Sequence, residues 1–330
     1  AISSSVINRT WVTMLPVFAS LQTVGASSSI KYLQLLHVAS RSTCWTQGHE
    51  LHYSASQARK MPFANCLSGG KELRSTDIVA LEYSDLKLTD KSSADFGHVR
   101  IRQHVNPFSS SFLEPAVVPD WNQFYRNPNL PLMIDIGCGS GRFLIWLAQK
   151  NRNSENYLGL EIRKKLVKRA ELWVKELTLN NVYNPAIKLN LIHYFDTHFL
   201  YRGFIFANAT VSFGQLVESY PGPIKVVSIL CPDPHFKRRH KKRRVVQKHL
   251  VEEIVACLEP NGEVFIGSDV HEVAVDMRGQ FDEKMKHVDE KGCDEEGWLL
   301  SNPMGIRTER EIHAEFEGAK IYRRLYKKHF

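Results

Sequence analysis

The sequence predicts an α/β fold built on a doubly wound, mostly parallel sheet. From residue 130 onward, short apolar runs rich in β-branched residues alternate with longer stretches of helical periodicity, which is the arrangement of repeated strand–helix units. A glycine-rich turn separates the first such strand from the first helix, as in many open α/β sheets. We therefore assign residues 96–330 of this 330-residue chain to one α/β domain.

The first two strand–helix units are predicted between residues 132 and 179. Leu132–Ile136 is a buried strand that ends at a glycine, and Arg142–Lys150 follows it with a helical pattern. Tyr157–Glu161 is the second strand. The charged stretch Arg163–Leu179 is an amphipathic helix, because its apolar side chains recur near helical spacing at Leu166, Ala170, Trp173 and Leu177.

Further strands and two more helices complete the pattern. The remaining strands are predicted at 204–207, 224–230, 263–267 and 319–326. An apolar stripe predicts a helix over Val245–Leu258, which stops at the turn residues Pro260-Asn261-Gly262. A last helix is expected near residues 271–287.

Residues 1–95 differ in composition from the rest of the chain. Serine recurs here, and through Gly70 the only acidic residue is Glu50, whereas the basic residues are Arg9, Lys31, Arg41, Arg59 and Lys60. A basic, serine-rich, acid-poor composition is typical of an organelle transit peptide. We predict a transit peptide or disordered extension addressed to the chloroplast, with the mitochondrion as the alternative. Upstream sequence that is not translated would have the same appearance.

Two other classes of protein are disfavoured. No apolar run approaches the ~20 residues needed to cross a bilayer, so no membrane association is predicted. The six cysteines are scattered without a C-x-x-C pair, which disfavours a disulfide scaffold and a zinc site. We predict thiols in a reducing compartment and no bound metal.

The most informative segment joins a carboxylate to a cluster of cations. Pro232-Asp233-Pro234-His235-Phe236 runs into Lys237–Arg244, which holds seven cationic side chains in eight residues. The formal net charge of the chain is +8, so nearly all of the basic excess lies here. A polyanion bound by this run would be presented to Asp233. A solvated helix start or a targeting signal is the alternative interpretation.

The position of Asp233 along the chain supports a catalytic role. Ile224–Leu230 is predicted to be a buried strand, so Asp233 lies just past its carboxyl end. Open α/β sheets bind their ligands at that edge. We therefore predict that Asp233 is the catalytic residue.

A second candidate site begins after the first strand. Its loop contains three glycines, Gly137, Gly139 and Gly141, which let a ligand approach the backbone closely. The spacing G-x-G-x-G favours S-adenosylmethionine over a dinucleotide, and Asp135 would attract a cationic aminoacyl group but repel pyrophosphate. Glu161 ends the second strand, where it can accept hydrogen bonds from a ribose diol. A tight turn with only a structural role is the alternative.

Asn208 and Ala209 follow the third predicted strand. They are candidates for contact with an adenine edge, although Asn at a strand end is often a turn former. With the motifs above and the later pair Thr308 and Glu311, they make residues 98–328 resemble the tRNA (guanine-N7)-methyltransferase family. Arg100–Pro107 also resembles the segment that opens the family's domain. The basic run is more similar to the bacterial and plastid branch than to the nuclear branch, which needs a partner subunit.

The resemblance implies a Rossmann-like, seven-stranded sheet of the class I methyltransferase type and methyl transfer from S-adenosylmethionine to N7 of guanine 46 in the tRNA variable loop. It implies tRNA as the partner, no obligatory protein subunit, and a monomer or homodimer. Guanine N7 has a free lone pair, so the enzyme must position the base and tolerate its developing positive charge. Asp233 can do this by accepting hydrogen bonds from guanine N1–H and N2–H.

The resemblance also assigns substrate-binding residues. The cations directed at phosphates are Lys237, Arg238, Arg239, Lys241, Arg243 and Arg244. The substrate-binding candidates in the opening segment are Arg100, Arg102 and His104. Thr308 and Glu311 line the cofactor and guanine pocket, where Arg310 occupies a position that is often aromatic. Asp269 is a secondary candidate with a helix N-cap as the competing role. His235 and Phe236 either stack on a base or pack beneath their loop.

One segment departs from the family pattern. Residues 182–203 form an atypical insertion, which is either a surface loop or translated intron.

Three other functions compete with guanine-N7 methylation. An exocyclic-amine methyltransferase is disfavoured because Asp233 is followed by only one proline. A non-catalytic RNA-binding protein with a vestigial cofactor fold is the alternative from another class. A nicotinamide-dependent oxidoreductase is disfavoured by the glycine spacing.

Overall fold

The computed structural model describes residues 73–88, 104–151, 154–182, 203–288 and 292–329, all of which belong to one compact unit that spans residues 63–330. The transit-peptide assignment of residues 1–72, the insertion at 183–202, and the two candidate side chains Arg100 and Arg102 lie outside the described residues. No helix within the described ranges is long and apolar enough to span a membrane.

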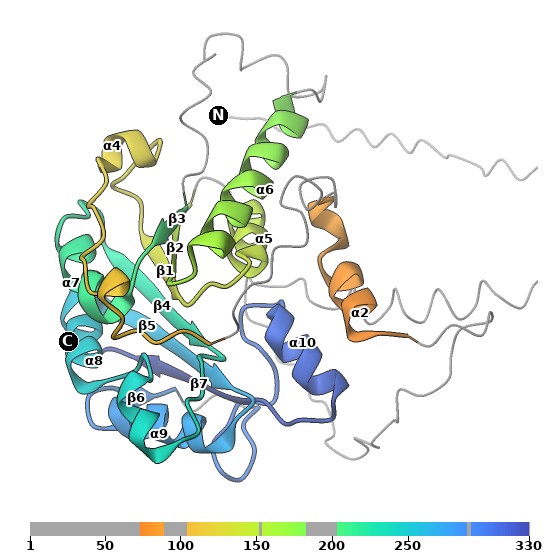
Figure 1. Ribbon diagram of the computed structural model, residues 1–330, viewed down its shortest axis with the longest axis vertical. Coiled ribbons are helices and arrows are strands. Elements are labelled where there is room, and N and C mark those ends of the chain that lie inside the picture. The colour runs from red at the N-terminus through yellow and green to blue at the C-terminus, as the bar shows by residue number, and fades with distance from the viewer. Residues whose placement is uncertain (1–72, 89–103, 152–153, 183–202, 289–291, 330) are drawn as a thin grey trace, which may run out of the picture. The chain divides into compact units, whose positions relative to one another are not determined.

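A seven-stranded sheet in the order β3-β2-β1-β4-β5-β7-β6 forms the centre of the domain (Figure 1). The strands are β1 Leu132–Ile136, β2 Asn156–Glu161, β3 Phe204–Phe206, β4 Ile224–Leu230, β5 Leu258–Ser268, β6 Lys286–His287 and β7 Tyr322–Lys327. The first five are parallel, whereas β7 runs antiparallel to both β5 and β6. The predicted doubly wound class I methyltransferase sheet is confirmed.

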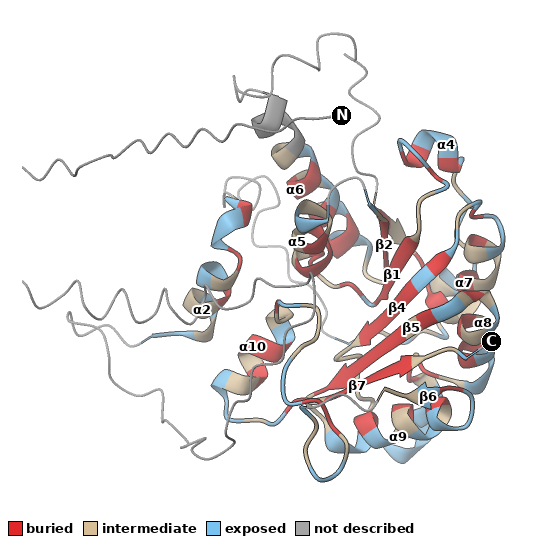
Figure 2. Ribbon diagram, turned by 180° about the vertical axis from the view of Figure 1, so that it is seen from behind, coloured by how far each residue is buried: buried red, intermediate tan, exposed pale blue. Residues whose placement is uncertain are grey.

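Two hydrophobic clusters cover the two faces of this sheet. One joins the sheet to α4 Trp121–Phe124, α7 Ala209–Glu218, α8 Lys248–Cys257 and α9 His271–Asp282. The other joins it to α2 Ser75–Glu82, α5 Arg142–Lys150, α6 Lys164–Val182 and α10 Glu309–Phe316. Figure 2 shows the central strands as the most buried part of the domain, because helices pack on both sides of them.

Three predicted boundaries differ from the structure. The Pro260-Asn261-Gly262 turn lies inside β5 as an irregularity, where Asn261 takes a positive φ of 65° while pairing with β4 continues on either side. Helix α8 begins at Lys248 because the preceding residues belong to the loop that carries the basic run. Helix α9 ends at Asp282, since Lys286 and His287 instead pair with β7 as an edge strand.

The N-terminal extension was predicted to reach residue 95, and this boundary is wrong. Helix α2 and the 3-10 helix η1 Ser84–Leu86 pack on the domain and bury Val79, Tyr83 and Leu86. The Tyr83 hydroxyl donates to the Arg307 carbonyl oxygen at 2.5 Å, and Trp146 Nε1 donates to Asp85. These apolar residues carry the helix into the core, although the stretch before them has the composition of a leader.

Candidate active site

The tips of β1 and β4 lie side by side at the carboxyl edge of the sheet. Ile136 of β1 is in register with Leu160 of β2 on one side and with Ile229 of β4 on the other. This is the point where the strand order reverses, which is where open α/β sheets bind their ligands. The glycine loop and Asp233 therefore emerge next to each other, as the sequence predicted.

The glycine loop connects β1 to α5 through three positive φ angles, 81° at Gly137, 57° at Gly139 and 81° at Gly141. A Cβ atom at Gly137 would meet no atom within 4 Å, so the loop presents bare backbone to open space. A Cβ at Gly141 would instead lie 2.7 Å from the Phe204 ring. The first glycine thus leaves room for a ligand, and the last permits close packing.

Glu309 ties this loop to α10, which sequence reasoning did not anticipate. The Ser140 hydroxyl donates to Glu309 Oε2 at 2.5 Å, and Arg142 forms an ion pair with the same carboxylate. The Arg142 guanidinium also stacks over the Trp173 ring at 4.5 Å. These contacts hold the beginning of α5 in place, which makes the cradle preorganised.

Asp135 lies on the β4 side of β1 and is 4% exposed. The Ser228 hydroxyl donates to Asp135 Oδ1 at 2.7 Å. Burial raises the pKa of Asp135 to about 7; the hydrogen bond from Ser228 lowers this pKa, and the nearby Glu161 raises it. A cation bound beside this carboxyl would stabilise its ionised form. Ser228, a polar residue inside an apolar strand, was a signal that the sequence offered.

Glu161 ends β2 and is 1% exposed. It accepts a hydrogen bond from Gly139 N at 2.9 Å, and it accepts from Arg163 through its backbone N at 2.9 Å, its Nε at 2.8 Å and its Nη2 at 3.1 Å. Ribose hydroxyls would have to replace some of the Arg163 bonds. The ribose role of Glu161 therefore remains a prediction that depends on movement of Arg163.

The Asn208 side chain has a structural role in this structure, and its predicted adenine contact stays a prediction. Asn208 is the N-cap of α7, and its Oδ1 accepts from both the backbone N and the hydroxyl of Thr210. Its Nδ2 donates to the carbonyl oxygens of Pro107 and Phe112, at 3.2 Å each. All of its hydrogen-bonding groups are used, so the turn-forming role is the one observed. Ala209 follows it and is buried.

Asp233 lies past the end of β4 with about a third of its side chain exposed, and His104 Nδ1 lies 3.2 Å from its Oδ1. The His104 and His235 rings are 6.5 Å apart. Burial lowers the pKa of His235, and the neighbouring His104 and Arg243 act in the same direction while Asp233 opposes them. Three predicted residues separated by up to 131 positions thus meet at one point.

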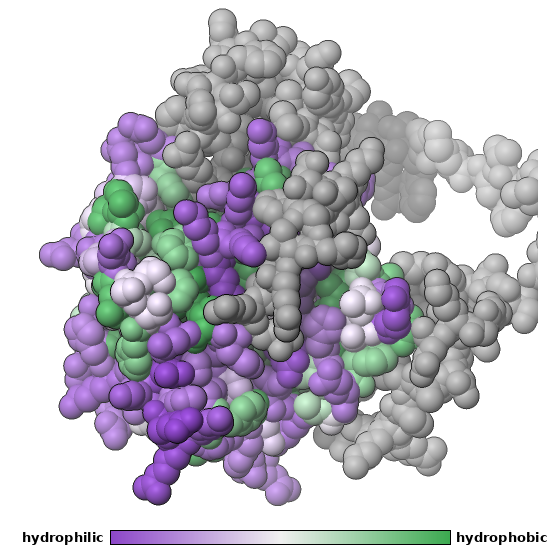
Figure 3. Space-filling model, in the orientation of Figure 1, coloured by the Kyte–Doolittle hydropathy of each residue, from purple (hydrophilic) through white to green (hydrophobic). Residues whose placement is uncertain are grey.

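The basic run forms the 3-10 helix η3 Arg238–Arg243 and its flanks. Most of its cationic side chains are exposed: Lys237, Arg238, Arg239, Lys241 and Lys242. In Figure 3 the surface around α9 of Figure 1 is strongly hydrophilic, in agreement with this exposure. Arg243 is half-buried. An anionic ligand can reach the exposed side chains of the run, although Lys241 also pairs with Glu272.

Arg244 was predicted to hold RNA, and the structure contradicts this. Its side chain is only 3% exposed. Its Nε donates to the carbonyl oxygen of Pro234 at 2.9 Å, and its Nη1 and Nη2 pair with Asp276 and Glu272 at 3.0 Å each. Two carboxylates of α9 thus neutralise Arg244, which in turn fixes the backbone next to Asp233.

Comparisons with known proteins agree with this arrangement. Residues 129–324 match a family model described as "Putative methyltransferase". A tRNA (guanine-N(7)-)-methyltransferase from Synechococcus sp. is 42% identical over 227 residues, which cover 69% of this chain and 83% of that protein. A protein of the same name from Nostoc sp. is 40% identical over 233 residues, covering 70% and 94%. The chain belongs to the tRNA (guanine-N7)-methyltransferase family.

Among solved structures, the aminoglycoside resistance methyltransferase NpmB1 matches at a TM-score of 0.37 with 16% identity, covering 62% of this chain and 88% of that one. This similarity is too low to bear on function, so the family assignment depends on the sequence relatives.

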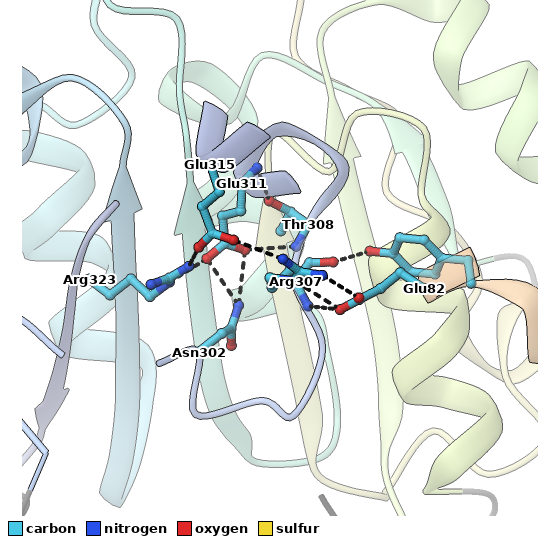
Figure 4. A network of polar contacts seen from close by, with 8 residues as sticks. Glu82, Asn302, Arg307, Thr308, Glu311, Glu315 and Arg323 are labelled. Atoms are coloured by element: carbon cyan, nitrogen blue, oxygen red, sulfur yellow. Dashed lines mark hydrogen bonds and ion pairs between the residues drawn. The ribbon is translucent and has the colours of Figure 1, made fainter. Parts of the chain in front are cut away.

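The family's late element, Thr308 with Glu311, lies at the beginning of α10. Thr308 is the N-cap of α10, and its backbone N donates to Glu311 Oε2 at 2.7 Å in a capping box. Glu311 is 1% exposed and also binds Arg323 Nε at 2.5 Å and Asn302 Nδ2 at 3.0 Å. Figure 4 shows this network between α10 and β7. Glu311 thus has a structural role, and the predicted pocket-lining role of this element stays a prediction.

For Asp269 and Phe236, the structure excludes one of the two predicted roles: the helix N-cap for Asp269 and packing beneath the loop for Phe236. The N-cap of α9 is Val270, so Asp269 is not a helix cap; it pairs with Arg310 Nη2 at 2.5 Å. Burial raises the pKa of Cys231, with Glu311 and Asp269 acting in the same direction, so both carboxylates lie near the end of β4. Phe236 is 67% exposed, which excludes packing beneath its loop.

Among the described residues, no group of three or more His, Cys, Asp or Glu side chains is arranged to hold a metal ion. Cys138, Cys231 and Cys257 are free thiols.

Proposed function

We propose that this member of the tRNA (guanine-N7)-methyltransferase family transfers a methyl group from S-adenosylmethionine to N7 of guanine 46 in tRNA. The observation that supports it most is the adjacency of the glycine cradle at β1 and Asp233 past the end of β4, with exposed cations on the same loop as Asp233. This adjacency would bring a methyl donor and a nucleobase into one crevice.

The residues of the cradle fit a cationic cofactor. Asp135 is a buried carboxyl whose pKa of about 7 leaves it ready to ionise beside an ammonium group. Open space at Gly137 leaves room for the cofactor against the backbone. When bound, S-adenosylmethionine supplies an electrophilic methyl group on sulfur. Asp135 would orient the aminoacyl end, and Glu161 would accept hydrogen bonds from the ribose once Arg163 releases it.

Asp233 would bind and orient the guanine. Its carboxylate can accept hydrogen bonds from guanine N1–H and N2–H, which fixes the base in plane and offsets the positive charge that develops as N7 is alkylated. No proton has to leave N7, so no general base is required. His104, now paired with Asp233 Oδ1, would be displaced or would share the carboxylate with the base.

The exposed cations of the basic run would hold the RNA backbone. Lys237, Arg238 and Arg239 follow Asp233 directly and face solvent. Charges of this kind bind phosphates without reading sequence, so they would set the register of the tRNA on the protein. Selection of guanine would then depend on Asp233.

The test uses the full chain, labelled S-adenosylmethionine and unmodified tRNA transcripts. Incorporated label should map to N7-methylguanosine at position 46 by borohydride–aniline cleavage. A transcript with adenine at that position is the matched control and should take up no label. Label in an exocyclic amine would favour the rival base methyltransferase, and binding of tRNA without any label would favour a non-catalytic RNA-binding protein.

We further propose a chloroplast address, with the mitochondrion as the alternative, and activity without an obligatory partner subunit as a monomer or homodimer. The first is supported by the basic, acid-poor composition before residue 70, and the second by the form of the basic run. A fluorescent fusion of the first 72 residues tests the address. Light scattering of the active protein, purified alone, tests the subunit requirement.

A further inference from the structure

Phe108 lies in the segment that brings His104 to Asp233, and its side chain is 46% exposed. The backbone around it is well anchored. Asn208 donates to the carbonyl oxygens on both sides, at Pro107 and at Phe112, and Ser109 N closes a turn by donating to the Asn106 carbonyl oxygen at 3.0 Å. The turn therefore holds the large apolar ring of Phe108 in solvent, where it does not contribute to the hydrophobic core.

The surroundings of Phe108 are cationic. The ammonium of Lys242, an exposed residue of η3, lies 5.9 Å from the centre of the ring. Four residues before Phe108 along the chain, His104 contacts Asp233. The ring thus belongs to a segment that touches the catalytic carboxylate at one end and the basic run at the other.

An exposed aromatic ring beside a phosphate-binding cation is the recurring arrangement of single-stranded RNA sites. Every nucleobase presents a π-face, and stacking on an aromatic side chain contributes ~1–3 kcal/mol per base. Proteins that read unpaired RNA use such rings to hold bases that have left the helical stack. An apolar protein partner would gain less here, because Lys242 and its neighbours on η3 would have to be desolvated.

We propose that Phe108 is a stacking platform for an unpaired nucleobase that flanks the target guanine, with Lys242 contacting the adjoining phosphate. This inference rests on the proposed function, because it names a contact for the same RNA. The stacked base would fix the position of its neighbour, so that the guanine enters the crevice at Asp233 in one orientation. Stacking is insensitive to base identity, so the platform would favour a looped conformation over a sequence.

Steady-state kinetics with unmodified tRNA test the platform. Phe108→Ala should raise KM for tRNA by about 5- to 150-fold, from the stacking free energy, and leave KM for the methyl donor unchanged. Phe108→Trp should retain the wild-type KM. Phe316→Ala is the matched control, because Phe316 on α10 is 44% exposed and is not part of the predicted site. Unchanged tRNA kinetics in Phe108→Ala would overturn the proposal.

A binding measurement separates failure of the platform from failure of the proposed function. A tRNA with 2-aminopurine on either side of the target guanine should lose fluorescence on binding to the wild type, and this quenching should be absent with Phe108→Ala. If the wild type quenches but methylates no tRNA, the proposed function fails alone. If it methylates tRNA and Phe108→Ala quenches equally, the platform fails alone. Loss of binding to another protein, with tRNA kinetics unaltered, would indicate a protein-docking residue instead.

Discussion

Arg239 and Arg244 belong to one run of cations, yet one is exposed and the other has a side chain that is 3% exposed. The difference lies in what each guanidinium can reach. Arg244 lies within hydrogen-bond distance of two carboxylates on α9 and of the Pro234 carbonyl oxygen, whereas Arg239 extends from η3 into solvent. A run of like charges can thus combine exposed cations, which we propose contact RNA, with a buried arginine that supports the loop next to Asp233. The carboxylates of α9 make the difference.

The largest effect on kcat should come from substitution of Asp233. Arg244 acts on the reaction only by positioning the loop that carries Asp233, so its loss should have a smaller effect. Asp233→Asn keeps the shape of the side chain but removes its charge. We expect kcat to fall by about 100- to 1000-fold, as for loss of one group that stabilises transition-state charge, while Kd for tRNA changes little. Single-turnover methylation and filter binding give both quantities. Equal loss of rate and affinity would contradict the catalytic assignment.

Arg244→Ala should come next. Without the bond to the Pro234 carbonyl oxygen, the loop loses its anchor, and a misplaced Asp233 should lower kcat by about 10- to 100-fold. The dependence of tRNA affinity on salt should stay unchanged, because an already neutralised guanidinium releases no phosphate counterions. Arg244→Lys should restore part of kcat.

Lys241→Ala is the matched control for Arg244. Lys241 pairs with Glu272, one of the two carboxylates that bind Arg244, but its side chain is half exposed. Its loss should leave kcat near the wild-type value. If Arg244→Ala instead flattened the salt dependence as strongly as an exposed arginine does, the two ends of the run would be equivalent and the comparison would fail.

Exposed arginines should show the opposite signature. Arg238→Ala and Arg239→Ala should each weaken tRNA binding and reduce the slope of log K against log salt by about 1, with kcat retained at saturating tRNA. Titrations between low and physiological salt measure the slope. An unaltered slope would mean that these cations contact no phosphate.

The smallest expected effect is a change in stability and cofactor affinity with pH, which comes from the buried carboxyl of Asp135. Folding raises the pKa of Asp135 to about 7, so the apo protein should lose stability as pH rises from the ordinary carboxyl range to 7 and then level off. A cationic cofactor needs the ionised form, so its Kd should improve about tenfold from pH 6 to pH 8. Ser228→Ala removes a bond that lowers this pKa and should move the midpoint to higher pH. A flat calorimetric profile would contradict the assignment.

The sheet and its carboxyl edge could be predicted because buried parallel strands leave a continuous apolar pattern in the sequence. The glycine loop, Asp135 and Asp233 follow those strands directly, so their meeting depended only on strand order. His104 was named as a substrate-binding residue from the family resemblance, and the structure places it next to Asp233. The positions of the glycine loop, Asp135 and Asp233 could be predicted without knowing which distant residues they contact.

The structural roles of Arg244 and Glu311 were not predicted, and that of Asn208 was predicted only as an alternative. Each side chain is used up by partners that local patterns do not reveal: two carboxylates of α9, Arg323 of β7, and two carbonyl oxygens of the 107–112 segment. Thr308 and Glu311 do have the spacing of a capping box, which was a local signal for the structural role. Whether a polar residue serves a ligand or the fold depends on these tertiary partners.

The packing of α2 limits how far the N-terminus could be trimmed if the proposed transit peptide is removed. A peptidase that cut at the predicted boundary, near residue 95, would remove Tyr83 and Leu86 from the second hydrophobic cluster and take Glu82 from Arg307. The product would expose an apolar surface next to α10 and would be prone to degradation. If the proposed transit peptide is removed, the cut must lie ahead of Ser75 for the protein to keep α2.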